Sequence, residues 1–441
     1  MRKWLWGSLA GASLLLLGGG YYTYPMLQIG SGYAAKMACS CHFLQGRSMT
    51  DIQQKDLNFS VLGKMSLELD EEKRQVRSSL FGLAPRTAQY IPGRGCVLMA
   101  DEAKAWPEAL PESQAARQPD SLLLPFDSLP PGIDLPALEK AVARAFEPIS
   151  GGGTRAVVIL YQGRLLYEAY APGFDANTPL LGWSMTKSIT NALIGLRIKS
   201  GHLALDDREL FPEWQQDERS DIRLRDLLHM NSGLQWNEAY GSTSDATTML
   251  YLQADMAAYA KNRPLESTPD TKWVYSSGTS NQLSAIIRNT FPDENSYLSF
   301  IRDSLFQALG MHSALIESDQ SGKAVGSSYG WATARDWARF GLLYLQDGYW
   351  NGEAFLPKGW VSWSQEVANG SEGIYGAHIW LKTHDATNAP DDVFQFRGFQ
   401  DQRIVMIPSR ECVLVRLGMN DDQTFDLNTF IKEVLDALPA K

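Results

Sequence analysis

A serine and a lysine lie three residues apart in the stretch Gly182–Ser188, as Ser184-x-x-Lys187. The residues that follow, 189–199, carry apolar side chains at helical spacing, and Gly201 is a typical helix stop. We therefore expect Ser184 to open a helix, where unpaired backbone N–H groups and the positive end of the helix dipole favour developing negative charge. Residues three apart share one helix face, so both side chains are predicted to face the same cleft.

This pair of side chains has a specific chemistry. A serine hydroxyl becomes an effective nucleophile when a neighbouring group takes its proton, and a lysine can do so only where its pKa falls well below the reference of about 10.4. The alternative interpretation is a capped amphipathic helix with an exposed lysine. A four-residue pattern with two free positions arises by chance in long chains, so the motif alone gives the two interpretations roughly equal weight.

A tyrosine follows in the stretch Tyr275–Gly278, which leads into a second helix-like segment. At such a loop-to-helix junction a phenol can project into a cleft, and beside Lys187 it can act as a general base or carry a proton to a leaving group. Taken alone, Tyr275 is more often a packed aromatic with a hydrated hydroxyl.

The predicted strand Val393–Phe399 contains Gly398, which permits close approach of another backbone or a ligand. If this strand borders the cleft, the N–H of Phe399 joins that of Ser184 as an oxyanion hole. The alternative is a simple bulge. The loop Trp236–Tyr240 is rich in groups that can hydrogen-bond a substrate, or it is a surface turn around a buried Trp236.

Three elements in this order, Ser184-x-x-Lys187, Tyr275-Ser276-Ser277 and Phe396-Arg397-Gly398, resemble the signature elements of serine β-lactamases and penicillin-binding proteins. More narrowly, the chain resembles the class C-like branch that includes esterases and 6-aminohexanoate-oligomer hydrolases. The resemblance covers roughly residues 135–435, and the stretches that carry it are Gly182–Ser188, His229–Leu234, Tyr275–Gly278, Ala332–Asp336 and Gly398–Gln402.

The resemblance implies acyl transfer through a covalent serine ester, without a metal or cofactor. Ser184 matches the nucleophile, Lys187 the first base and Tyr275 the catalytic tyrosine, while the Ser184 and Phe399 backbones match the oxyanion hole. Tyr240 falls where nylon-oligomer hydrolases carry a tyrosine that contacts the substrate.

The departures from the family pattern bear on the substrate. Ser277 stands where class C β-lactamases have an asparagine, as in the nylon-hydrolase type. Phe396-Arg397-Gly398 lacks the lysine and threonine that ordinarily help to hold a β-lactam carboxylate, so we do not expect efficient β-lactam hydrolysis. Arg397 either replaces them as an anion partner or, through strand alternation, points away from the cleft.

The order of elements predicts an α+β fold with an antiparallel sheet flanked by helices and a mostly helical insertion. A helix is expected over 135–147, a hairpin over 156–170 around Gln162-Gly163, a short glycine-capped helix over 224–234, and a meander of three strands over 393–417. The predicted domains are a signal or membrane anchor over 1–25, a small β-rich module over 26–104, a proline-rich connector over 105–134 and the serine hydrolase domain over 135–441.

The N-terminal segment begins with Arg2 and Lys3 and then has no charged residue from Trp4 to Tyr24, which is typical of an export signal or a membrane anchor. We favour an uncleaved anchor and an exported protein. In an oxidising compartment Cys39 or Cys41 is expected to pair with Cys96, whereas Cys412 is expected to be a buried thiol. The net charge of −10 without a basic stripe argues against a nucleic-acid partner.

These observations give a first hypothesis, a serine hydrolase of small amides or esters on the outer side of the membrane. The nearest alternative is a D-alanyl peptidase or a weak class C-like β-lactamase. An alternative from another class is a non-catalytic envelope binding protein that keeps the fold.

Overall fold

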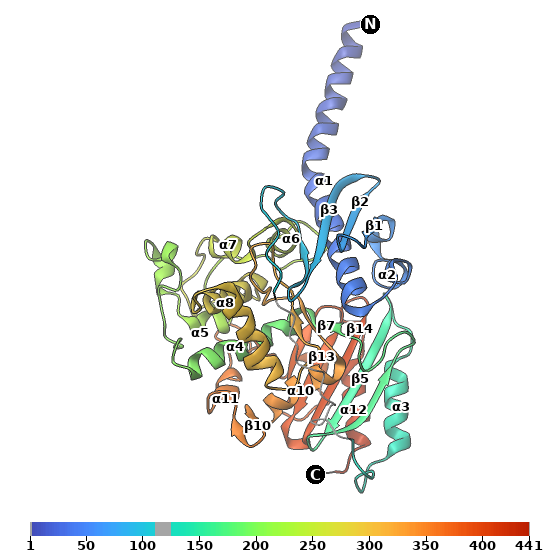
Figure 1. Cartoon of the computed structure of the whole chain (residues 1–441), viewed down its shortest axis with the longest axis vertical. Helices are drawn as coiled ribbons and strands as arrows, with labels where there is room; N and C mark the ends of the chain where they lie inside the picture. The colour runs from blue at the N-terminus through green and yellow to red at the C-terminus, as the bar shows by residue number, and fades with distance from the viewer. Residues whose placement is uncertain (1, 111–124, 441) are drawn as a thin grey trace. The chain divides into compact units, whose positions relative to one another are not determined.

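The structure, a computed structural model, describes residues 2–110 and 125–440, with side chains from residue 23 onward (Figure 1). Its residue contacts define two compact units. The first comprises Met1–Ile91, Gly95–Glu108 and Asn237–Ala254, and the second comprises Pro92–Arg94, Ala109–Trp236 and Asp255–Lys441. A segment from the middle of the chain therefore groups with the N-terminal residues, and the domain boundaries given above stay predictions.

A long helix, α1 (Arg2–Gln45), packs in the first unit against an antiparallel meander in the order β1-β2-β3-β4. The other elements of this unit are α2 (Met49–Lys55), the 3-10 helix η1 (Ser60–Lys64), β1 (Ser66–Asp70), β2 (Gln75–Leu80), β3 (Leu83–Ile91), β4 (Gly95–Leu98) and α6 (Asp245–Leu252). β1 and β2 form an antiparallel hairpin on either side of residues 71–74.

The module over 26–104 was expected to be β-rich. This expectation is wrong for residues 26–45, which belong to α1, and for residues 49–55, which form α2. Ser31, Ala34, Ala35 and Ala38 are fully buried at helical spacing, so small side chains line the face of α1 that packs on the unit's core. Among the described residues, no helix combines the length and the apolar character that crossing a membrane requires. The anchor stays a prediction.

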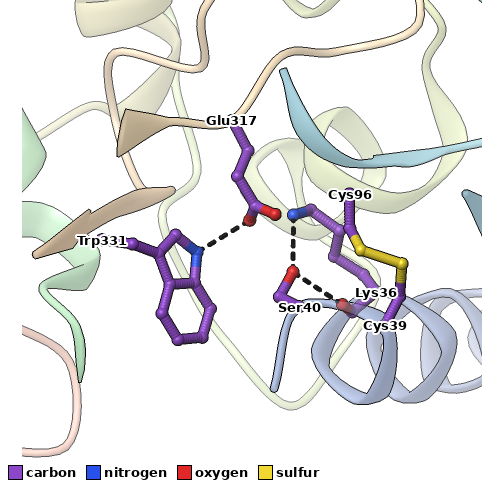
Figure 2. Close-up of a disulfide and its surroundings, with 6 residues drawn as sticks. All are labelled: Lys36, Cys39, Ser40, Cys96, Glu317 and Trp331. Atoms are coloured by element: carbon purple, nitrogen blue, oxygen red, sulfur yellow. Dashed lines mark hydrogen bonds between the residues drawn. A yellow bond between two sulfur atoms is a disulfide. The ribbon is translucent and has the colours of Figure 1, made fainter. Parts of the chain in front are cut away.

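A disulfide joins Cys39 of α1 to Cys96 of β4, with Cα atoms 6.0 Å apart (Figure 2). The sequence left Cys39 and Cys41 open as partners of Cys96. Two positions along a helix are rotated by about 200°, so only one of them can face β4. Cys41 and Cys412 are buried thiols outside any disulfide, which confirms the core position expected for Cys412.

An antiparallel sheet in the order β12-β13-β14-β5-β6 forms the centre of the second unit. Its strands are β5 (Gly153–Tyr161), β6 (Arg164–Tyr170), β12 (Phe394–Gly398), β13 (Gln402–Ile407) and β14 (Cys412–Met419). The predicted hairpin and meander are confirmed. Gln162 and Gly163 both have positive φ angles, as the two-residue turn between β5 and β6 requires.

Helices cover both faces of this sheet. Val157 and Ile159 pack into a core with α3 (Leu135–Ala145) and α12 (Leu427–Asp436). On the other face Val158 and Leu160 belong to the core that includes α4 (Thr186–Lys199), α8 (Ser277–Asn289) and α10 (Ala334–Leu345). Alternate residues of one strand thus enter two cores, and the predicted α+β fold is confirmed.

The segment between α4 and β12 is mostly helical, as expected. Its elements are η3 (Pro212–Trp214), η4 (Glu218–Asp221), α5 (Leu224–Leu228), α7 (Met256–Lys261), α9 (Glu294–Ser299) with the π-helical η5 (Phe300–Gln307), α11 (Trp360–Ser364), η6 (His384–Ala386) and the short strands β8 (Leu315–Ile316), β9 (Gly330–Ala332), β10 (Tyr349–Trp350) and β11 (Glu353–Ala354). The helix expected over 224–234 ends earlier, at Leu228, because Met230 has a φ of 60° that α-helix excludes.

Candidate active site

Ser184 lies in a 3-10 turn, η2 (Trp183–Met185), between β7 (Leu180–Leu181) and the first residue of α4. Trp183, directly before it, has a φ of 47°, an unfavourable conformation for a bulky side chain. Its buried indole holds this conformation by donating a hydrogen bond to Oε1 of Gln400, 3.2 Å away. The α-helix starts two residues later than expected, and Ser184 stands at its N-terminal end.

Lys187 projects from the first turn of α4 and is only 1% exposed. Its Nζ atom lies 3.0 Å from three oxygens: Oγ of Ser184, Oγ of Ser277 and the carbonyl of Ser327. The exposed lysine of the alternative interpretation is therefore wrong.

The three oxygens around Nζ differ in what they can do. An ammonium group donates to all three, whereas a neutral amine has two N–H groups and one lone pair. The Ser327 carbonyl can only accept, and a serine hydroxyl can accept or donate. A neutral Lys187 can thus donate to Ser327 and Ser277 while its lone pair accepts the Ser184 proton, which is the geometry of a general base.

Tyr275 lies where the sequence predicted, at the junction between a loop and α8. Ser276 caps the helix by accepting a hydrogen bond from the backbone N–H of Thr279 at 3.0 Å, and Ser277 is the first helical residue. The helix start therefore presents Ser277 and Tyr275 toward Lys187, whose Nζ lies 4.9 Å from the Tyr275 ring centroid. The tyrosine ring thus lies beside the lysine of the Ser184–Lys187 pair.

Aromatic side chains surround Tyr275. Its ring centroid lies 5.3 Å from Trp380, 5.8 Å from Tyr375 and 6.4 Å from Trp273. Tyr375 is buried, whereas Trp273, Tyr275 and Trp380 are partly exposed. The group fixes the tyrosine ring and offers an apolar surface beside the serine.

Gly398 ends β12 against the backbone of η2. A Cβ atom at this position would lie 2.1 Å from the carbonyl oxygen of Gly182, so no other residue allows this approach. β12 pairs with β13 in unbroken register from Phe394 to Gly398, which excludes the alternative of a bulge. The next residue, Phe399, packs its ring edge-on against Trp183 at 5.8 Å. The backbone after Gly398 thus runs past the residue that precedes Ser184.

Arg397 forms an ion pair with Asp385 at 3.1 Å, and its guanidinium lies 4.8 Å from the Trp380 ring centroid. Burial, and then repulsion from Arg403, lowers the pKa of Arg397 to about 10. The sequence left two alternatives for Arg397, an anion partner for the substrate or a side chain that points away from the cleft. The structure shows a guanidinium that already has a carboxylate partner and that supports the aromatic group.

Tyr240 belongs to the first unit, where it is exposed and its hydroxyl donates to Glu238 at 2.8 Å. It is not among the side chains that the second unit brings together, and its contact with substrate stays a prediction. Trp236 is half-buried rather than buried. A Cβ on Gly278 would lie 2.5 Å from its ring, so the indole covers the start of α8.

No motif in the sequence indicated two groups at the site, the Ser327 carbonyl and His378. The Ser327 carbonyl is a backbone atom, which no motif identifies. His378 is buried behind α4, and its backbone carbonyl accepts a hydrogen bond from Ser188 at 2.7 Å. Its Nδ1 lies 2.7 Å from the carbonyl of Leu228 and must carry the proton, so Nε2 accepts from Ser280 at 2.8 Å.

This histidine is neutral near pH 7. Burial is the main cause that lowers the pKa of His378 to about 3, and the charge of Lys187 lowers it further. Within the described part of the chain, no three His, Cys, Asp or Glu side chains are grouped as a metal ion requires.

The fold and this cluster of serine, lysine and tyrosine side chains resemble the site type of β-lactamases and related hydrolases. The family profile described as Beta-lactamase matches residues 142–429, well over half of the 441-residue chain. The chain therefore belongs to the β-lactamase family, as its three signature elements predicted, and membership supports a serine hydrolase activity in general terms.

Several solved structures share the fold. A Bacillus anthracis protein provisionally assigned as a 6-aminohexanoate-dimer hydrolase is 20% identical, with a TM-score of 0.57 over 69% of this chain and 83% of that chain. A penicillin-binding protein homologue of Caulobacter crescentus is 15% identical, with a TM-score of 0.55 over 71% and 99%. EstCE1, a hydrolase with promiscuous acyltransferase activity, is 16% identical, with a TM-score of 0.52 over 69% and 98%. No curated protein sequence matches the chain.

Proposed function

We propose that this protein is a serine hydrolase that cleaves a small amide or ester through an acyl group carried on Ser184. The observation that carries the proposal is the buried Lys187 amine, which lies 3.0 Å from the hydroxyl oxygens of both Ser184 and Ser277. A lysine amine in this position can take the proton of the serine, which is a function that a purely structural lysine does not have.

In the acylation step the Ser184 oxygen bonds to the substrate carbonyl carbon while its proton moves to Lys187. The backbone N–H groups of Ser184 and Phe399 are the proposed donors to the resulting oxyanion, and the N-terminal end of α4 adds a favourable dipole. When the intermediate collapses, the bond to the leaving group breaks, and Tyr275 or Lys187 protonates the departing nitrogen or oxygen. A water molecule then attacks the ester and restores Ser184 by the reverse proton movements.

The surroundings of the serine bear on the substrate. Trp273, Tyr275 and Trp380 offer partly exposed aromatic surface, which favours a substrate with an apolar chain or ring beside its scissile bond. Arg397 already has Asp385 as its carboxylate partner, which counts against the anionic group of a β-lactam or a D-alanyl peptide as the preferred substrate.

The proposed location is outside the cytoplasm, with the N-terminal segment as the membrane anchor. The uncharged run Trp4–Tyr24 supports it, and so does the Cys39–Cys96 disulfide, because such bonds persist in oxidising compartments.

The test is the mass of the intact protein after incubation with a serine-directed phosphonate. We expect one phosphonyl adduct on the wild type and none on Ser184→Ala. Thermal unfolding is used to check that the variant is folded. Ser40→Ala, which changes a serine in the first unit, is the matched control and is expected to keep the adduct. Equal labelling of the wild type and Ser184→Ala would contradict the proposal.

Product release from a p-nitrophenyl ester, a 6-aminohexanoate dimer and a penicillin then separates the substrate classes. A stable or slowly released penicillin adduct would favour the peptidase or weak β-lactamase. If no reagent reacts and Ser184→Ala leaves cellular behaviour unchanged, the binding-protein alternative holds instead.

A further inference from the structure

The two hairpin tips at opposite ends of β2 in the first unit have opposite character. The turn between β1 and β2 consists of Glu71, Glu72, Lys73 and Arg74, all exposed. The turn between β2 and β3 carries Phe81, which is 79% exposed, and Leu83, which is 57% exposed. Large apolar side chains at this exposure are unfavourable in water. The charged tip at the other end of the same strand shows that a turn of this sheet can consist of charged residues instead.

Further exposed apolar side chains of this unit lie on α1. Tyr24 and Met26 are each 48% exposed. Val61 of η1 is also exposed, and η1 packs near this part of α1, since a Cβ on Gly30 would lie 2.8 Å from Met65.

The apolar tip and Tyr24 lie at the same end of the unit. α1 packs against β2 and β3, and Figure 1 shows their hairpin reaching along α1 toward the helix N-terminus. Tyr24 acts electrostatically on Arg86, opposing the effect of burial that lowers the pKa of this arginine. Arg86 lies three residues from Leu83 on β3, a span of about 10 Å.

The sequence indicates what lies at this end. Within the uncharged stretch that follows Lys3, three tyrosines stand at positions 21, 22 and 24. Tyrosine is enriched where a membrane meets water, because its ring is apolar and its hydroxyl is hydrated. The tyrosines therefore mark the level of an interface, and the β2–β3 tip lies near that level.

We propose that Phe81 and Leu83, together with Tyr24 and Met26, form a docking surface that enters the interfacial region of a lipid bilayer beside the N-terminal segment. The bilayer is the occupant because Tyr24 and Met26 belong to the uncharged stretch of α1 that runs from Trp4 to Ala35. The surface gives the unit a second contact with the membrane, which fixes its orientation, and it is independent of the chemistry at Ser184.

The test places an environment-sensitive NBD fluorophore on the full chain as Phe81→Cys, bound to vesicles of phosphatidylethanolamine and phosphatidylglycerol. The remaining thiols, Cys41 and Cys412, are buried and do not compete for the label. We expect blue-shifted NBD emission that is quenched by lipids with a nitroxide in the upper acyl chain. Glu72→Cys, at the charged tip of the same strand, is the matched control and keeps the emission seen in water.

Emission at position 81 equal to that at position 72 on vesicles would overturn the proposal. A blue shift that appears without vesicles and grows with protein concentration would also overturn it, since a second copy would then cover the tip.

Discussion

Two helices of this protein each bury a lysine beside a serine one turn away. In the second unit Lys187 bonds Ser184, and in the first unit Lys36 donates to the Ser40 hydroxyl at 3.2 Å (Figure 2). Both lysines are 1% exposed. Burial and one-turn spacing are therefore common to a proposed catalytic pair and to a pair in an N-terminal helix.

The surroundings of the two serines differ. Ser40 lies inside α1, and its hydroxyl donates to the backbone carbonyl of Lys36 at 3.0 Å, so its proton is held by the helix itself. Ser184 lies at a helix N-terminus, where the dipole favours an alkoxide, and β12 approaches the turn that holds it. The comparison teaches that the Ser/Lys spacing and burial alone do not distinguish the two pairs, whereas the helix end and the neighbouring strand do.

Replacing each lysine by glutamine is the strongest test of the difference between the two pairs. Lys187→Gln is expected to lower the rate of acylation by about 10²–10⁴-fold, since a general base is lost. Lys36→Gln is expected to lower stability without changing kcat/KM of the folded protein. Stopped-flow acylation and urea unfolding of both variants measure these effects, and a similar loss of acylation in both would remove the distinction.

The strand that approaches Ser184 is tested by Gly398→Ala. The added methyl group cannot occupy a position 2.1 Å from the Gly182 carbonyl, so β12 must shift away and carry the Phe399 N–H with it. Loss of one oxyanion donor typically costs about 10²–10³-fold in kcat. Gly153→Ala is the control in the same sheet, because a Cβ there meets no atom within 4 Å. Unchanged kcat in Gly398→Ala would show that Phe399 is not a donor.

A smaller effect is expected from Ser277→Ala, which removes one of the three oxygens around Nζ of Lys187. One hydrogen bond between neutral groups is worth about 1 kcal/mol, so kcat should fall about fivefold with little change in KM. Steady-state kinetics separates the two constants. A rise in KM alone would instead assign Ser277 to substrate binding.

A different kind of effect concerns pH and stability rather than rate. His378 has its pKa lowered to about 3, whereas an unfolded histidine titrates near 6.5. Below pH 6.5 the unfolded chain therefore binds a proton that the folded chain does not, and the stability that His378 contributes is lost as the pH falls toward 3. Between pH 7 and pH 5 this amounts to about 2 kcal/mol.

The variant His378→Asn should remove that dependence, because asparagine does not titrate and tolerates the φ of 57° at this position. Urea unfolding at pH 7 and pH 5 gives the difference for the variant and the wild type. His229 and Asp319, whose pKa values of about 4 and about 6 also depart from their usual ones, contribute equally to both proteins. A variant with the same pH dependence as the wild type would contradict the neutral, buried state of His378.

Much of the second unit was predictable because its signals are local. The β5–β6 hairpin, the meander over β12–β14 and the junction before α8 follow from alternation, turn residues and capping between neighbours in sequence. In the first unit the small buried side chains of α1 concealed its helical period, because alanine and serine give a weak hydrophobic pattern.

By itself the sequence determined the family, the order of its motifs and the two residues whose spacing places a hydroxyl and an amine on one helix face. Only the tertiary structure decided that the Ser327 carbonyl lies against the Lys187 amine and that Arg397 is already paired with Asp385. The physical reason is that these contacts join residues more than ten positions apart, and their distances are set by how helices and strands pack rather than by any local pattern.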